Sequence, residues 1–135
     1  MSRAPILFED FQPGASMGER VEVYDALQIR RWQAIFGSQP DDGADGPVEG
    51  ACMAVVSMMR AYLNVVAPRP PGNVHAKQQL SMHGIPQQGE ALRVAVVCAS
   101  KAMRRERRYV ELQVSGTGHG GRKLFDGLLT LIWAA

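Results

Sequence analysis

Glu49 is the residue of this chain whose position most favours chemistry, because it lies at the start of a long apolar stretch, residues 47–66. Pro47 suits the first turn of a helix, since its missing N–H group has no intrahelical partner to lose. A carboxylate at the N-terminal end of a helix is stabilised by the helix dipole, which also keeps it ionised. An ionised carboxylate can serve as a general base or as a nucleophile. The alternative is that Glu49 only stabilises the helix.

A loop expected at residues 38–46 brings further acidic residues to the same place, since its glycine, proline and aspartate content excludes a strand or a helix interior. Asp42 is a candidate base if this loop folds over a pocket, and a solvated surface position is the alternative. Histidine offers less, because His75 and His83 lie about 26 Å apart on an extended strand and cannot bind one metal ion within a chain. The sequence therefore predicts neither a metal site nor a cofactor.

Basic residues form one cluster in the second half of the chain. It comprises Lys101, Arg104, Arg105, Arg107 and Arg108. Guanidinium groups bind phosphate through paired hydrogen bonds, so Arg104 and Arg105 are candidate phosphate-binding residues. A solvated hairpin is the alternative. Nucleic acid is a poorer partner, because no aromatic residues are interleaved with the basic ones and the net charge is only +2.

The stretch 47–66 that carries Glu49 predicts a helix that is apolar around almost its whole circumference. At about 100° per residue, its polar side chains fall on one narrow stripe. The stripe comprises Glu49, Ser57, Arg60 and Asn64. Other elements must wrap most of such a helix. Arg60 and Asn64 also argue against a membrane span, since a charge at mid-membrane costs at least about 2.5 kcal/mol.

Strands make up most of the remaining chain. They are expected at 16–23, 74–83, 90–100, 107–116 and 123–133, with an extended arm at 2–15 and turns at 101–105 and 117–121. In the first strand, Met17, Val21 and Val23 share the apolar face. A short helix is expected between Asp25, as its N-cap, and Gly37. The last strand is apolar on both faces, as a central or interface strand would be.

The composition fits one folded domain, expected over residues 1–135. Apolar residues make up 46% of the chain and charged residues 21%. The two cysteines have no metal-binding spacing and no secretory signal precedes them, so we expect reduced thiols in a cytoplasmic protein. The element order predicts an α+β protein in which one antiparallel sheet, with its last four strands in a meander, curls around the long helix.

Three short motifs lie in a suggestive order along the chain. They are Phe8-Glu-Asp-Phe-Gln-Pro-Gly14, Ile85-Pro-Gln-Gln-Gly-Glu90 and the segment from Ser115 to Gly127. Together with the element order, they resemble the hotdog fold, and within it the MaoC-like group of R-specific enoyl-CoA hydratases and dehydratases. The resemblance covers nearly the whole chain. It implies a hotdog domain that pairs edge to edge as a homodimer, with its active site at the interface.

The catalytic motif of that group is where this sequence departs from it. MaoC-like hydratases carry Gly-Asp-x-Asn-Pro-aliphatic-His after the short helix, and their Asp and His activate water. Here Gly37 is followed by Ser38 in place of the Asp, and no histidine lies between Gly37 and the long helix. Glu49 stands where the group has a further histidine. Glu49, Asp42 and Ser38 are therefore the candidate catalytic residues.

The resemblance also implies how a thioester would be bound. The start of the long helix resembles an oxyanion site, in which the backbone N–H groups of Gly50 and Ala51 face the thioester carbonyl. Trp32 is a candidate lining residue of an acyl tunnel, with core packing as its default role, and Arg104 and Arg105 would hold the phosphates of coenzyme A or of a carrier-protein arm.

Three functions follow from this resemblance. A MaoC-like acyl-thioester hydratase or dehydratase with a non-standard site is the first. A hotdog thioesterase that uses Glu49 is the second, and a non-catalytic acyl-thioester binding protein is the third. In each case the partners are an acyl-CoA or acyl-carrier-protein thioester and a second copy of the chain, with no nucleic acid and no membrane.

Overall fold

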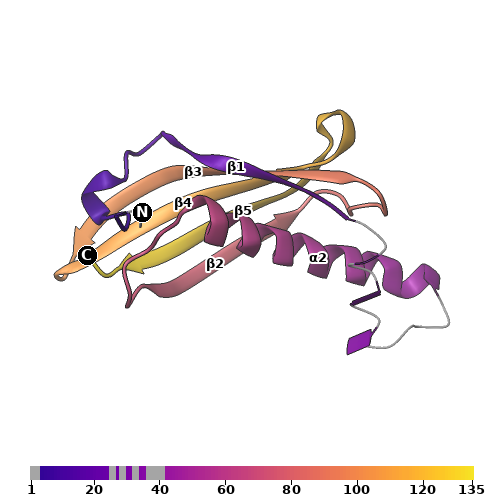
Figure 1. The fold of residues 1–135 in the computed structure, drawn as a ribbon, viewed down its shortest axis with the longest axis horizontal. Helices are drawn as coiled ribbons and strands as arrows, with labels where there is room; N and C mark the ends of the chain where they lie inside the picture. Colours follow the sequence, from indigo (N-terminus) through magenta and orange to yellow (C-terminus); the bar gives the residue numbers. More distant parts are fainter. Residues whose placement is uncertain (1–3, 25–26, 28–29, 32–33, 36–41) are drawn as a thin grey trace.

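In the computed structural model, the described residues are 4–24, 27, 30–31, 34–35 and 42–135, and for residues 42–51 only the backbone is described. The elements follow the chain in this order: η1 (Phe8–Asp10), β1 (Ser16–Val23), α2 (Asp42–Val65), β2 (Val74–Met82), β3 (Ala91–Arg104), β4 (Arg107–Thr117), η2 (His119–Gly121) and β5 (Lys123–Trp133). The five strands form one antiparallel sheet, and α2 lies across one of its faces (Figure 1). The predicted sheet and long helix are therefore confirmed.

The core lies between α2 and the sheet face that it covers. Period-two alternation places apolar side chains of the central strands on this face. The buried strand residues include Val94, Val96, Leu112, Val114, Leu129 and Leu131, and the buried helix residues include Met53, Ala54, Met58 and Ala61. Close approach of the two layers explains Gly127 of β5, since a Cβ there would come within 2.7 Å of the Met58 sulfur. We infer that this glycine permits the helix to lie close to β5.

The helix begins earlier than the sequence predicts. It starts at Asp42 rather than Pro47, so the expectation of a loop through Gly46 is wrong. Aspartates are favoured in the first turn of a helix by its dipole, and Asp42 and Asp45 lie there. Pro47 is consequently the sixth residue of α2, where it lacks one backbone hydrogen bond but does not end the helix.

Strand β1 has its predicted bounds, and a bulge near its start changes which of its residues share a face. A bulge between Ser16 and Gly18 changes the alternation at Met17. Val21 and Val23 are therefore 53% and 44% exposed, and the polar even-numbered residues face α2. Val21 and Val23 share one face of the strand, as predicted, but Met17 does not share it, because the bulge adds one residue between them.

The strand order is β1-β3-β4-β5-β2, so the last four strands are not a simple meander. Strands β3, β4 and β5 pair in sequence, but β2 pairs with β5 at the far edge. The segment 83–90 crosses from β2 to β3 beside the start of β5, where the His83 N–H donates to the Leu124 carbonyl at 2.8 Å. This crossing makes β5 a central strand, as its two apolar faces indicate, and leaves β1 and β2 as the edges.

Two connections differ from the expected ones. Strand β3 continues to Arg104, so residues 101–104 are strand rather than turn, and the turn itself is Arg105 and Glu106. The N-terminal arm contains the short helix η1 and buries Phe11, whose ring lies 4.9 Å from that of Trp133. The burial of Phe11 depends on a contact between distant segments, which local sequence patterns do not record.

The predicted short helix after β1 is only partly within the described residues. Those described there are helical, namely Leu27, Arg30, Arg31, Ala34 and Ile35. Its predicted ends, Asp25 and Gly37, lie outside them. Among the described residues, no helix is long and apolar enough to cross a membrane.

Candidate functional site

Asp42 and Glu49, two of the residues predicted for catalysis, lie in the first half of α2. Ser38 and Trp32 are outside the described residues. Asp42 is the first residue of α2, and Glu49 lies two turns further on. The N–H groups left free by a helix are those of its first four residues, whereas N–H groups further along bond to carbonyls within the helix. The predicted oxyanion donors, Gly50 and Ala51, are therefore in the helix interior, and the free donors lie next to Asp42.

The last residues of β3 and the first half of α2 lie at opposite ends of the molecule (Figure 1), and Arg104 and Arg105 follow one another where β3 ends. Glu22 of β1 shows where α2 lies along β3. It pairs with Leu92 of β3, and its carboxylate accepts a hydrogen bond from Ser57 of α2. Arg104 is twelve residues beyond Leu92 on β3, which is about 40 Å at the usual strand rise. Glu49 lies in the opposite direction along α2. Within one chain the structure does not bring the predicted catalytic and phosphate-binding residues together.

The polar stripe of α2 meets the polar face of β1. Ser57 Oγ donates a hydrogen bond to Glu22 Oε1, and Ser57 is only 1% exposed. The Arg60 and Arg20 guanidinium groups lie 3.6 and 3.7 Å from Glu22 Oε2. Two arginines and one hydroxyl thus compensate a carboxylate whose side chain is 9% exposed. The helical periodicity predicts the stripe, whereas the role of Glu22 was not predicted, although the alternating polar residues of β1 were a signal for it.

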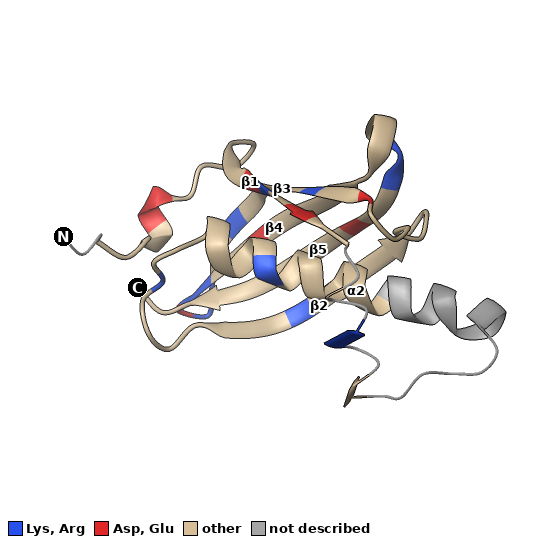
Figure 2. Ribbon diagram, turned by 45° about the vertical axis from the view of Figure 1, so that its right-hand side comes forward, with Lys and Arg blue, Asp and Glu red and all other residues tan. Residues whose placement is uncertain are grey.

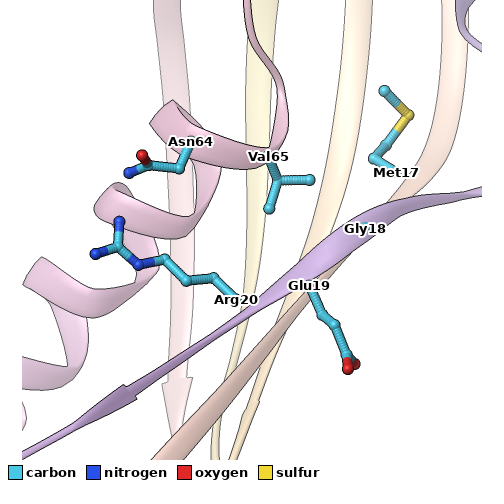
Figure 3. A pocket seen from close by; sticks show the side chains of 6 residues that line it. All are labelled: Met17, Gly18, Glu19, Arg20, Asn64 and Val65. Atoms are coloured by element: carbon cyan, nitrogen blue, oxygen red, sulfur yellow. The ribbon is translucent and has the colours of Figure 1, made fainter.

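A cleft of about 420 Å³ opens beside this network, between β1 and the last turn of α2. Arg20 extends from β1 toward the helix turn that carries Asn64, and Val65 points toward Gly18 (Figure 3). Glu19 points to the other side of the strand, where its carboxylate accepts from Arg93 at 3.0 Å. The cleft is therefore lined by apolar residues and by the polar side chains of Arg20 and Asn64.

A second buried carboxylate, Glu90, lies just before β3, at the end of the sheet nearest the first half of α2 (Figure 1). Its side chain is 3% exposed and accepts from the backbone N–H groups of Gln87 at 3.0 Å and His119 at 2.9 Å, and from the Arg122 guanidinium. Burial opposes ionisation of Glu90, but these donors outweigh it and lower its pKa. The ionised carboxylate thereby joins the β2–β3 segment to the β4–β5 turn.

Among the described residues, His83 and Asp126 form a histidine–carboxylate pair, with His83 Nε2 2.9 Å from Asp126 Oδ2. Asp126 alternates along β5 with Phe125 and Gly127, which face the helix. Asp126 therefore lies on the outer face of the sheet, where both members of the pair are about two-fifths exposed. This pair cannot replace the missing Asp and His of a site between helix and sheet.

The architecture and helix packing together define this chain as a hotdog fold, as predicted. Comparison with solved structures supports that assignment over nearly the full length. The MaoC-like dehydratase from Rhodospirillum rubrum is 17% identical, with 96% of this chain and 98% of that chain covered and a TM-score of 0.75. An R-hydratase from Pseudomonas aeruginosa is 16% identical, with 96% and 86% covered and a TM-score of 0.71.

A third solved structure, the (R)-hydratase from A. caviae involved in PHA biosynthesis, is 14% identical. The match covers 93% of this chain and 99% of that chain, with a TM-score of 0.68. No protein-family model matches the sequence, and no curated protein matches it. At these identities, the likeness establishes the fold and leaves the chemistry to be argued from the residues.

Proposed function

We propose that this chain is an acyl-thioester hydratase or dehydratase of the MaoC-like type, with a non-standard active site around Glu49. The observation that carries the proposal is the fold match to a dehydratase and to R-hydratases over nearly all of this chain. Its substrate class is an enoyl thioester of coenzyme A or of a carrier protein. The long apolar helix supplies the hydrophobic layer beside which an acyl chain would lie.

Hydration of an enoyl thioester requires a base for water and an acid for the α-carbon. The Glu49 carboxylate removes a proton from water, and the oxygen of that water forms a C–O bond to the β-carbon. The electron pair of the double bond passes to the thioester carbonyl as an enolate. Glu49 then returns its proton to the α-carbon, so that one water is added and the base is regenerated. Asp42 and Ser38 are the proposed groups that hold the water.

The free N–H groups at the start of α2 suit the enolate oxygen. They belong to the first turn, beginning at Asp42, and carry the positive end of the helix dipole. Donors aimed at the developing oxyanion stabilise it without reorganisation. In this proposal they replace Gly50 and Ala51 as oxyanion donors.

The proposed assembly is a homodimer that pairs through the β2 edge. All residues of β2 except Leu80 are exposed, and within the described part of the chain the strand pairs only with β5. An exposed strand edge presents free backbone N–H and C=O groups to another strand. Sedimentation analysis should give twice the chain mass, and a monomer at micromolar concentration would contradict the dimer.

Turnover of crotonyl-CoA by purified protein tests the function. Loss of the enoyl thioester absorbance without release of free thiol is expected, and Glu49→Gln should reduce the rate at least about a hundredfold, the lower range for a general acid–base. Glu19→Gln, which neutralises an exposed carboxylate on β1, is the matched control and should retain activity. Thiol release without hydration would favour the thioesterase, and binding of acyl-CoA without turnover would favour the non-catalytic binding protein.

A further inference from the structure

The hairpin that joins β3 to β4 carries a large excess of positive charge. Residues 101–108 include five basic residues and one acidic residue, so this segment has twice the net charge of +2 of the whole chain. Figure 2 shows basic segments at this end of the sheet, near the C-terminus. Arg104, Arg105, Arg107 and Tyr109 line a cavity of about 490 Å³ there. None of these arginines has an ion pair with a carboxylate among the described residues.

The sequence of this hairpin is unfavourable for its own stability. Arg105 and Glu106 both adopt left-handed backbone angles, with φ of 50° and 66°. A two-residue turn with positive φ at both positions strongly favours Asn-Gly. Arg104 and Arg107 are also direct cross-strand partners, and like charges in that arrangement repel. Such local conflicts are expected at functional sites, and an anion between the two arginines would relieve the repulsion.

An aromatic surface lies directly beside these cations. The Arg104 guanidinium carbon lies 5.9 Å from the centroid of the Tyr109 ring. A second cavity of about 330 Å³ shares Arg104 and Tyr109 and continues across the sheet to Lys77 and Thr130. Planar rings stack on tyrosine and on guanidinium groups, while guanidinium groups also bind phosphate in a bidentate manner. The hairpin therefore places phosphate-binding groups next to a stacking surface.

We propose that this pocket binds a nucleotide. Its base stacks on Tyr109 or on the Arg104 guanidinium, and its phosphates lie between Arg105 and Arg107. Arg104 of the pocket lies about 40 Å along β3 from Leu92, and Glu49 of the same chain lies further in the opposite direction. The proposal therefore stands whether or not the chain is a hydratase. The ligand is either a free nucleotide or the nucleotide end of coenzyme A, which share this chemistry.

Isothermal titration calorimetry of the full chain with ADP, adenosine and inorganic phosphate tests the pocket. Saturable ADP binding should be at least about tenfold tighter than that of either fragment, and should weaken with salt as expected for phosphate contacts. Arg107→Gln should weaken ADP binding by about tenfold or more, the usual loss for a charge-assisted contact. Lys123→Gln, which removes an exposed positive charge at the other end of β5, should leave it unchanged.

A double substitution separates binding from folding. Arg105→Asn with Glu106→Gly supplies the residues that the turn favours, so the protein should melt no lower than the wild type. It should nevertheless bind ADP several-fold more weakly, because one phosphate-binding guanidinium is gone. A variant that is stable and binds ADP as the wild type does would overturn the role of Arg105 and with it the proposed pocket.

Titration with coenzyme A identifies the source of the ligand. Coenzyme A that binds as tightly as ADP and is weakened by Arg107→Gln supports the proposal with coenzyme A as the ligand, whereas binding of ADP alone supports a free nucleotide. Three results would overturn it: no saturable binding of either compound, phosphate binding as tight as that of ADP, or a single-stranded oligonucleotide that binds far more tightly than both. The last result would make the hairpin a nucleic-acid surface.

Discussion

Replacement of Glu90 by glutamine should destabilise the protein without changing the size of the side chain. The carboxylate accepts from two backbone N–H groups and from Arg122, and it is almost fully buried. In Glu90→Gln, an NH₂ group replaces one acceptor oxygen and faces a donor, so at least one buried hydrogen bond is lost and one donor is left unsatisfied. Loss of a buried charge-assisted bond costs about 1.5–3 kcal/mol.

The expected loss for Glu90→Gln is about 2–3 kcal/mol, toward the upper part of this range. It is not larger, because the Arg122 side chain is 39% exposed and water can replace part of its interaction with the carboxylate. For a chain of this length, the unfolding entropy makes 1 kcal/mol equivalent to about 3.5 °C in Tm. Thermal unfolding monitored by circular dichroism at pH 7 should therefore show a decrease of about 7–10 °C. Glu19→Gln is the matched control, since its carboxylate is 49% exposed and such pairs contribute less than about 1 kcal/mol.

The effect of Glu90→Gln should also depend on pH with a defined sign. The pKa of Glu90 is lower in the folded protein than in the unfolded chain, so its contribution is fully present above the unfolded value of about 4.3. The contribution is lost as pH falls through the folded pKa. The Tm difference between wild type and variant should therefore shrink below about pH 4. An unchanged Tm at neutral pH, or a difference that grows in acid, would refute this role of Glu90.

Two further substitutions test the packing that holds the long helix and the sheet. Ser57→Ala removes the hydroxyl that donates to the buried Glu22 carboxylate. Chemical denaturation should show that the free energy of unfolding falls by about 1.5–3 kcal/mol. A decrease of less than about 0.5 kcal/mol would show that the arginines alone satisfy Glu22. Gly116→Ala places a methyl group against the ring of Phe125, which is 1% exposed in the core. The free energy of unfolding should fall by about 1–3 kcal/mol. An unchanged denaturation midpoint would mean that the ring moves freely.

Much of the fold was predictable because its signals are local. Alternation predicted the bounds of β1, the glycine-rich turn at 117–121 indicated where β5 begins, and the apolar wheel predicted the body of α2. The start of α2 was not predictable, since glycine, proline and aspartate occur both in loops and in the first turns of helices. The prediction that Met17 shares a face with Val21 and Val23 failed for a different reason, since the bulge at Met17 depends on pairing with β3.

The candidate site was less predictable, because its residues are brought together by distant contacts. The roles of Glu22 and Glu90 depend on partners 35 and 32 positions away, Ser57 and Arg122, and each carboxylate reads as a surface residue in its own segment. The separation of Arg104 from Glu49 follows from the direction of α2 across the sheet, which no local pattern contains. Whether Glu49 acts in catalysis stays a prediction.

Hydration of crotonyl-CoA in H₂¹⁸O, followed by mass spectrometry of the product, tests the role of Glu49 most directly. The proposed mechanism predicts one ¹⁸O on the β-carbon of an intact thioester in the wild-type reaction, and little product with Glu49→Gln. Label in a free carboxylate, with release of thiol, would contradict hydration and indicate a thioesterase. Full labelling of the β-carbon by Glu49→Gln would contradict the assignment of Glu49 as the catalytic base.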